Sequence, residues 1–118
     1  MMSQQAAIEA LRNGAPEVER MRLAYAQRRN LMLKRFAEMG LPCFAPGGAF
    51  YMFPDIRKYG LSSKEFALRL LEEESVAVVP GSAFGEAGEG SVRACYATAY
   101  DKIVIAMDRL AAFVKRLG

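Results

Sequence analysis

The residues that decide the fold lie in three stretches, which read PGGAFYMFPDI at positions 46–56, VAVVPGSAFG at 76–85 and GEGSVR at 88–93. The first two stretches join an apolar or aromatic run to glycine and proline, and the third leads through glycine and serine into the run that starts at Val92. Apolar runs of about four to eight residues between such turn residues are typical of strands. The pattern predicts three strands, at 49–53, 76–79 and 92–97.

Two helices are predicted after residue 40. Ser62 and Glu65 have the spacing of a capping box, which indicates a helix over 63–73. Asp101 is a good N-cap for a second helix over 101–116. The resulting order is β-α-β-β-α.

This order predicts the topology of the sheet. Because crossover connections are right-handed, the first two strands should be parallel, with the helices packed on one face. The third strand can lie between them, antiparallel to both. The expected fold class is α/β, an α+β two-layer structure with a three- to four-stranded, mostly antiparallel sheet, preceded by a long helix.

The first 40 residues are predicted to be helical. Ser3 can cap a short helix that ends near Asn13, and the apolar spacing after Pro16 predicts a long helix over 16–39. A helix of that length exceeds what a small domain needs. We therefore expect residues 1–40 to join a larger domain and residues 41–118 to form a small C-terminal domain.

Composition excludes several classes of function. The net charge is only +3, and basic and acidic residues are interspersed, so no single-signed field would attract nucleic acid or an anionic membrane. No run approaches the roughly 20 apolar residues that span a bilayer, and the start lacks the regions of a signal peptide. We expect a cytoplasmic protein that binds neither nucleic acid nor a membrane.

The sequence contains no histidine, which removes the commonest general base and every Ser-His or Cys-His nucleophile arrangement. Cys43 and Cys95 lie far apart in apolar surroundings and are predicted to be buried free thiols. No metal site is predicted.

Arg93 stands out on physical grounds, because a charge at the start of an apolar strand needs a reason. A planar guanidinium suits a carboxylate held by two hydrogen bonds. The alternative is an arginine at a strand end that points to solvent or pairs with Glu86 or Glu89. The residues alone leave both interpretations open.

Neither a phosphate-binding loop nor a Schiff-base lysine is predicted. The loop over 80–90 lacks the Lys-Ser/Thr ending of a P-loop and leads into a strand. The five lysines fall on polar helix faces or in a loop, outside the buried setting that a Schiff-base lysine needs.

The chain resembles the C-terminal small domain of class I/II, fold-type I aminotransferases, which depend on pyridoxal phosphate. The stretches GGAFYMFP (47–54), EFALRLLEEESVAVVPGSAFG (65–85) and GEGSVRACYAT (88–98) carry the resemblance. It implies a parent enzyme that moves an amino group from an amino acid to a 2-oxo acid. In such enzymes the arginine matching Arg93 binds the substrate α-carboxylate, and the residue matching Phe50 lies in a strand that approaches the substrate.

The resemblance also implies that the aldimine lysine, the acidic partner of the pyridine nitrogen and the phosphate-binding residues lie in a large domain, before this region. We therefore assign no catalytic or cofactor-binding residue to this chain and expect it to be inactive alone, with no cofactor bound. We also expect a homo-oligomer, dimeric as the family implies, because the first two helices leave apolar faces uncovered.

Other functions remain open. Some carbon–sulfur lyases and cyclopropane-forming synthases share this small domain, so the parent reaction could be theirs. A small ligand-binding regulatory domain could have the same β-α-β-β-α order, and it would bind an amino acid without a cofactor. A basic nucleic-acid module is the third alternative, which salt-dependent binding to DNA or RNA would reveal.

Overall fold

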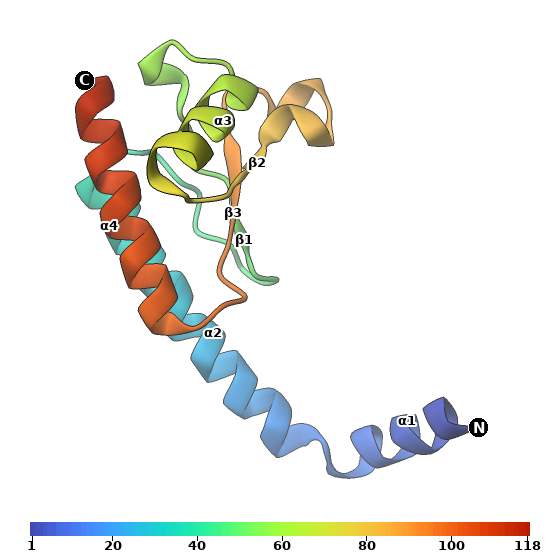
Figure 1. Ribbon diagram of the computed structural model, residues 1–118. Helices are drawn as coiled ribbons and strands as arrows, with labels where there is room; N and C mark the ends of the chain where they lie inside the picture. Colours follow the sequence, from blue (N-terminus) through green and yellow to red (C-terminus); the bar gives the residue numbers. More distant parts are fainter.

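A three-stranded sheet lies at the centre of the computed structural model, which describes residues 1–118 (Figure 1). The strands are β1 (Tyr51–Met52), β2 (Val79–Pro80) and β3 (Val92–Cys95). Strand β3 is the middle strand and pairs antiparallel with both neighbours. This arrangement confirms the predicted topology and fold class, although each strand is shorter than predicted.

The strand predicted at 76–79 is largely wrong, because β2 begins only at Val79. Helix α3 (Ser63–Glu74) is followed by its C-cap Ser75, whose backbone is left-handed with φ of 55°, and the next three residues stay outside the ladder. The side chain of Val76 is nevertheless buried. An apolar run therefore indicates that its side chains are buried. A residue can be buried without joining a β-ladder.

The helices lie close to their predicted positions, and the capping box of α3 is present. The Ser62 hydroxyl accepts a hydrogen bond from the Glu65 N–H at 3.1 Å, and the Glu65 carboxylate accepts one from the Ser62 N–H at 3.1 Å. The other helices are α1 (Met2–Asn13), α2 (Ala15–Glu38) and α4 (Tyr100–Leu117), with short 3-10 helices η1 (Arg57–Tyr59), η2 (Gly81–Phe84) and η3 (Glu86–Gly88).

Two predicted N-caps are wrong. Helix α1 begins at Met2, so Ser3 lies inside its first turn. Helix α4 is capped by Ala99, whose carbonyl oxygen accepts hydrogen bonds from the N–H groups of Lys102 and Ile103. Asp101 lies in the first turn instead, where a carboxylate also favours the positive end of the helix dipole. Composition therefore located the helix ends without identifying the capping residue.

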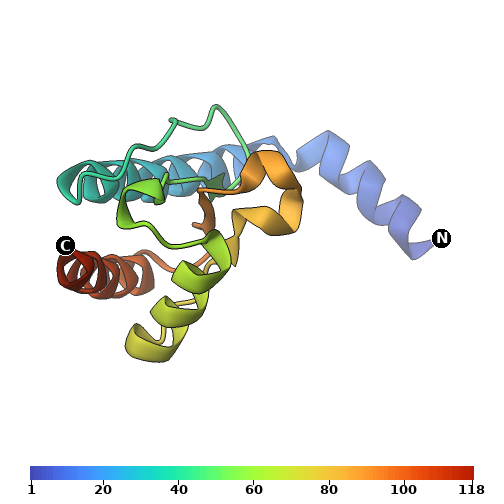
Figure 2. The same ribbon diagram turned by 90° about the horizontal axis from the view of Figure 1, so that it is seen from above.

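The helices cover one face of the sheet, and the core lies between them. Strand β3 directs Val92 and Ala94 into this core. Phe66 of α3 and Phe113 of α4 are fully buried and meet edge to face, with ring centroids 5.2 Å apart. Helices α2 and α4 lie side by side (Figures 1 and 2).

Helix α1 and the first half of α2 project away from the sheet (Figure 1). Helix α1 buries no residue, whereas the second half of α2 contributes the buried side chains of Met32 and Phe36 to the core. The division into domains at residue 40 stays a prediction. No helix combines the length and the apolar content that crossing a membrane requires.

The two cysteines are free, as predicted, but only one is shielded from solvent. Cys43 is partly buried, and burial raises the pKa of its thiol. Cys95 is exposed, so its predicted burial is wrong. It follows the buried Ala94 in β3, and alternation along a strand directs it to the opposite face.

Candidate functional site

Arg93 lies at the centre of the sheet, on the face that the helices leave open. It belongs to the middle strand, and Val79 of β2 lies opposite it. The register of β1 and β3 continues to a bridge between Asp55 and Ser91, which places Phe53 on the other side of Arg93. Arg93 is half-buried between the buried residues Val92 and Ala94, so its side chain leaves the core side of the strand.

Two aromatic rings hold the guanidinium group of Arg93. Its central carbon lies 4.2 Å from the ring centroid of Tyr51 and 4.8 Å from that of Phe84. The Phe84 ring in turn meets Phe53 edge to face, with centroids 5.9 Å apart. A cation over an aromatic face is attracted by the ring quadrupole. We call Tyr51, Phe53 and Phe84 the aromatic cluster.

The Arg93 guanidinium has no acidic partner: it forms no ion pair within 4.0 Å and no hydrogen bond with another residue. The alternative of a pair with Glu86 or Glu89 is therefore wrong. The Glu89 carboxylate instead accepts hydrogen bonds from Ser63. The hydrogen-bond donors of Arg93 are thus held in place and left free for an external acceptor such as a carboxylate.

Phe50 lies beside this site and contacts it through Tyr51. Its ring centroid is 4.6 Å from that of Tyr51, and it stacks on Tyr25 of α2 at 5.9 Å with the planes 24° apart. The Tyr96 hydroxyl donates a hydrogen bond to the carbonyl oxygen of Ala49 at 3.0 Å, which fixes the backbone just before Phe50. The two predicted site residues, Arg93 and Phe50, thus both contact the ring of Tyr51.

Sequence reasoning missed the residues that support Arg93. Tyr51 could have been predicted from the sequence. Side chains alternate along a strand, so within the aromatic run at 49–53 Tyr51 lies on the face opposite to the buried Met52. Phe84 and Glu89 could not have been predicted, since they lie in a glycine-rich loop whose path depends on contacts with α3. The loop starts at Gly81 and ends at Gly90, and in Figure 1 it stands beside α3.

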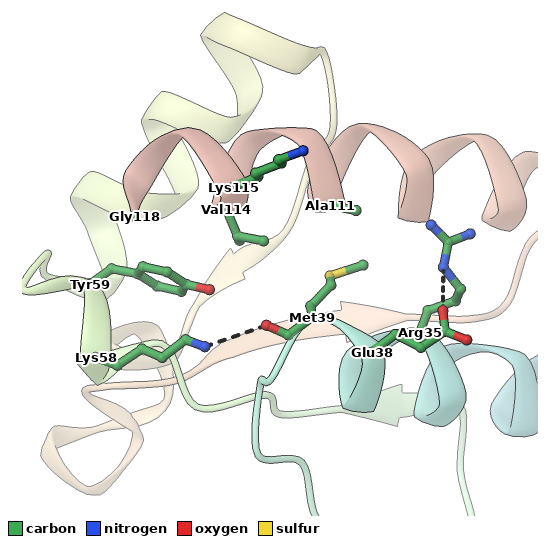
Figure 3. A pocket seen from close by; sticks show the side chains of 9 residues that line it. All are labelled: Arg35, Glu38, Met39, Lys58, Tyr59, Ala111, Val114, Lys115 and Gly118. Atoms are coloured by element: carbon green, nitrogen blue, oxygen red, sulfur yellow. Dashed lines mark hydrogen bonds and ion pairs between the residues drawn. The ribbon is translucent and has the colours of Figure 1, made fainter.

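A pocket of about 530 Å³ lies elsewhere, between the end of α2, η1 and the last turns of α4 (Figure 3). Of its basic side chains, Arg35 and Lys58 already have partners, whereas the exposed Lys115 has none. Arg35 pairs with Asp108 at 2.7 Å and with Glu38 at 3.4 Å. The Lys58 ammonium donates to the carbonyl oxygen of Gly40 at 2.8 Å. This pocket therefore joins helix ends, and its one unpaired donor, the exposed Lys115 ammonium, lacks the planar fork of an arginine.

The chain matches the family Aminotransferase class I and II over residues 2–110, and it belongs to this family. It is 56% identical over 114 residues to aromatic-amino-acid aminotransferase 2 of Thermococcus litoralis, covering 95% of this chain and 29% of that protein. It is 58% identical over 109 residues to an aspartate aminotransferase of Pyrococcus abyssi, covering 91% of this chain and 28% of that protein.

Solved structures show the same similarity in space. The aromatic aminotransferase from Pyrococcus horikoshii matches with a TM-score of 0.93 at 54% identity, over 96% of this chain and 31% of that chain. An aspartate aminotransferase from Thermus thermophilus with maleate matches with a TM-score of 0.83 at 40% identity, over 91% of this chain and 28% of that chain. The chain thus spans about three tenths of the length of the relatives it matches.

Pyridoxal phosphate, the cofactor that the family implies, does not fit the residues of this chain by themselves. All five lysines are exposed: Lys34, Lys58, Lys64, Lys102 and Lys115. The loop from Gly81 to Gly90 folds back on itself, so that a Cβ on Gly81 would lie 1.9 Å from the carbonyl oxygen of Gly88. It leads into β3 instead of a helix N-terminus, and it forms no phosphate cradle. Likewise, no group of Cys, Asp or Glu side chains could hold a metal ion.

Proposed function

We propose that this chain is the C-terminal small-domain part of a pyridoxal-phosphate-dependent aminotransferase, and that Arg93 binds the α-carboxylate of its substrates. One observation carries the assignment of Arg93: a guanidinium held between two aromatic rings on the open face of the sheet, with no acidic partner. The family membership supports the reaction class. The relative whose structure was solved with maleate, a dicarboxylate, is consistent with a carboxylate ligand.

The geometry gives Arg93 a defined task. The rings of Tyr51 and Phe84 contact the guanidinium group of Arg93. A carboxylate would instead be bound by the N–H groups along the edge of the planar guanidinium. Two parallel hydrogen bonds would fix both the position and the plane of the carboxylate. Every amino acid and every 2-oxo acid carries this group, so the same arginine would orient the amino donor and the amino acceptor.

Phe50 and Tyr51 would form the apolar flank of the bound substrate. Their rings contact each other, and Phe50 is 36% exposed, so it can still contact a ligand. Apolar side chains beside a charged pair exclude water and strengthen the electrostatic contact. These residues bind and orient the substrate, and none of them is assigned a catalytic role.

The cofactor supplies the electron sink for amino-group transfer, and residues outside these 118 would hold it. The chain alone would then be inactive. We propose a cytoplasmic, dimeric parent enzyme of amino-acid metabolism, with an amino acid and a 2-oxo acid as substrates. The exposed apolar side chains of α1 and α2, among them Leu11, Val18 and Leu23, would contact the rest of that assembly.

Steady-state kinetics of an aminotransferase that contains this chain test the proposal. Changing Arg93→Ala should raise KM for both the amino acid and the 2-oxo acid by about 30-fold or more, since loss of a charge-assisted contact costs on the order of 2–5 kcal/mol. Arg93→Lys should restore only part of the affinity, because an ammonium lacks the planar fork. Arg20→Ala, on the exposed face of α2, is the matched control. Unchanged KM values in the Arg93→Ala enzyme would refute the assignment.

A further inference from the structure

The loop between β2 and β3 carries one of the two rings that hold Arg93. Phe84 lies at the end of η2, and its side chain is 51% exposed, so burial alone does not hold it in place. It contacts the ring of Phe53 and the guanidinium of Arg93. Whatever fixes the loop therefore fixes this contact of the arginine.

Backbone hydrogen bonds anchor the loop only at its two ends. The Gly81 N–H donates to the carbonyl oxygen of Ser91 at 2.9 Å, and the Ile56 N–H donates to that of Gly90 at 2.9 Å. Between these points the backbone hydrogen bonds are local turns, such as Gly85 N–H to the Ser82 oxygen. Local turns shape a loop without fixing it against the rest of the molecule.

One side-chain network ties the loop to α3 through Ser82 and Glu89, which lie next to its two ends. The Glu89 carboxylate accepts a hydrogen bond from the Ser63 N–H at 2.8 Å and another from the Ser63 hydroxyl at 2.7 Å, one on each oxygen. The same hydroxyl accepts a hydrogen bond from the Ser82 N–H at 3.3 Å. These residues form the only side-chain hydrogen bonds between the loop and the rest of the chain.

Loss of this network would destabilise the N-terminus of α3. Ser63 is the first residue of α3, and its side chain is fully buried, with an exposed fraction of 0%. Without Glu89 the Ser63 N–H would be an unpaired donor at a helix N-terminus. A carboxylate there also interacts favourably with the helix dipole. The hydrogen bonds from Ser63 accordingly lower the pKa of Glu89.

We infer that Glu89 is a positioning residue for Arg93: through Ser63 it fixes the loop on α3, and the fixed loop holds Phe84 against the guanidinium. The effect of Glu89 on substrate binding rests on the proposed function, in which Arg93 binds a carboxylate through two hydrogen bonds. The orientation of the guanidinium matters for such a contact. The inference predicts that changing Glu89, which does not touch the guanidinium, weakens substrate binding in the same way as changing Phe84.

NMR on the 118-residue chain tests the structural part of the inference, that Glu89 fixes the loop and Phe84, and it requires no enzyme activity. The Nε–H signal of Arg93, assigned by its loss in Arg93→Lys, should carry a ring-current shift. Glu89→Gln should move this signal toward a solvent-exposed position and raise amide exchange at Ser63 and Ser82 at least 10-fold. Glu86→Gln is the matched control, with the same charge change in the same loop and no side-chain hydrogen bond. An unmoved signal and unchanged exchange in Glu89→Gln would overturn the inference.

Phe84→Leu keeps the test decisive if Glu89→Gln fails to fold, because Phe84 lies outside the core. It should move the Arg93 signal in the same direction. An unchanged chemical shift of the Arg93 Nε–H in Phe84→Leu would also overturn the inference.

Kinetics of the enzyme that contains this chain test the functional half. Glu89→Gln should raise KM for both substrates at least 5-fold and change kcat much less, and Glu86→Gln should leave both values unchanged. If Arg93→Ala has no effect on KM, the proposed function fails, whatever the NMR result. If Arg93→Ala raises KM and Glu89→Gln does not, only the positioning role fails.

Discussion

The two faces of β3 hold their side chains by different means. Val92 and Ala94 face the helices and are held by burial, at exposed fractions of 2% and 6%. Arg93, between them, contacts the partly buried ring of Tyr51 and the ring of Phe84, which is 51% exposed. The covered face provides the stability, and the open face keeps a charged group ordered while its hydrogen-bond donors remain free. The proposed binding residue is thus held in position while only half-buried.

The largest effect on stability is expected from the covered face. Phe113→Ala removes a ring with an exposed fraction of 0% that packs on Phe66 at 5.2 Å. Truncating such a side chain leaves a cavity and should lower the free energy of unfolding by about 3–5 kcal/mol. Phe84→Ala, on the open face, should cost less than about 1.5 kcal/mol. Urea denaturation of both variants measures the difference, and equal losses would contradict the comparison.

A smaller effect is expected where the loop meets itself. In Gly81→Ala the new Cβ would lie 1.9 Å from the carbonyl oxygen of Gly88, a backbone atom that cannot rotate away. The strain should lower the free energy of unfolding by about 1–3 kcal/mol. Gly47→Ala is the control, because nothing lies within 4 Å of its Cβ position. Equal shifts of the unfolding temperature in the two variants would show that the loop relaxes and avoids the expected clash.

Acid should weaken the network between the loop and α3. Hydrogen bonds from Ser63 lower the pKa of Glu89 below its ordinary value. A group with a lowered folded-state pKa contributes stability that is present above its unfolded pKa and is lost as the pH falls through the folded value. The chain should therefore lose stability below about pH 4.5, the ordinary value. The same pH series on Glu89→Gln should show a shallower loss, and a parallel loss would argue against this contribution.

The smallest effect on stability is expected from Arg93 itself. Arg93→Ala removes two cation–π contacts at a half-exposed site, each worth about 0.5–1 kcal/mol. Because the guanidinium has no acidic partner, no buried charge is left behind, and the chain should lose at most about 1–2 kcal/mol. Chemical denaturation measures it. A loss as large as that of Phe113→Ala would mean that Arg93 serves the fold more than a ligand.

Local signals in the sequence predicted the helices well. The Ser62 and Glu65 pair is present as a capping box, and the long apolar periodicity corresponds to α2 over Ala15–Glu38. Strand bounds were predicted less well, as at Val76, where an apolar run is buried without joining the ladder. Strand pairing depends on partners that are distant in the chain, and a local pattern contains no information on them.

By itself the sequence determined the family, the order of the elements and Arg93 as the candidate binding residue, because these follow from spacing and residue type within short stretches. Only the tertiary structure decided what surrounds that arginine. Tyr51 and Phe84 come from different segments, and they meet at Arg93 because the register of β1 with β3 and the contact of the loop with α3, made through Glu89, bring them there. Such contacts are set by packing between distant segments, so they become visible only once the chain has folded.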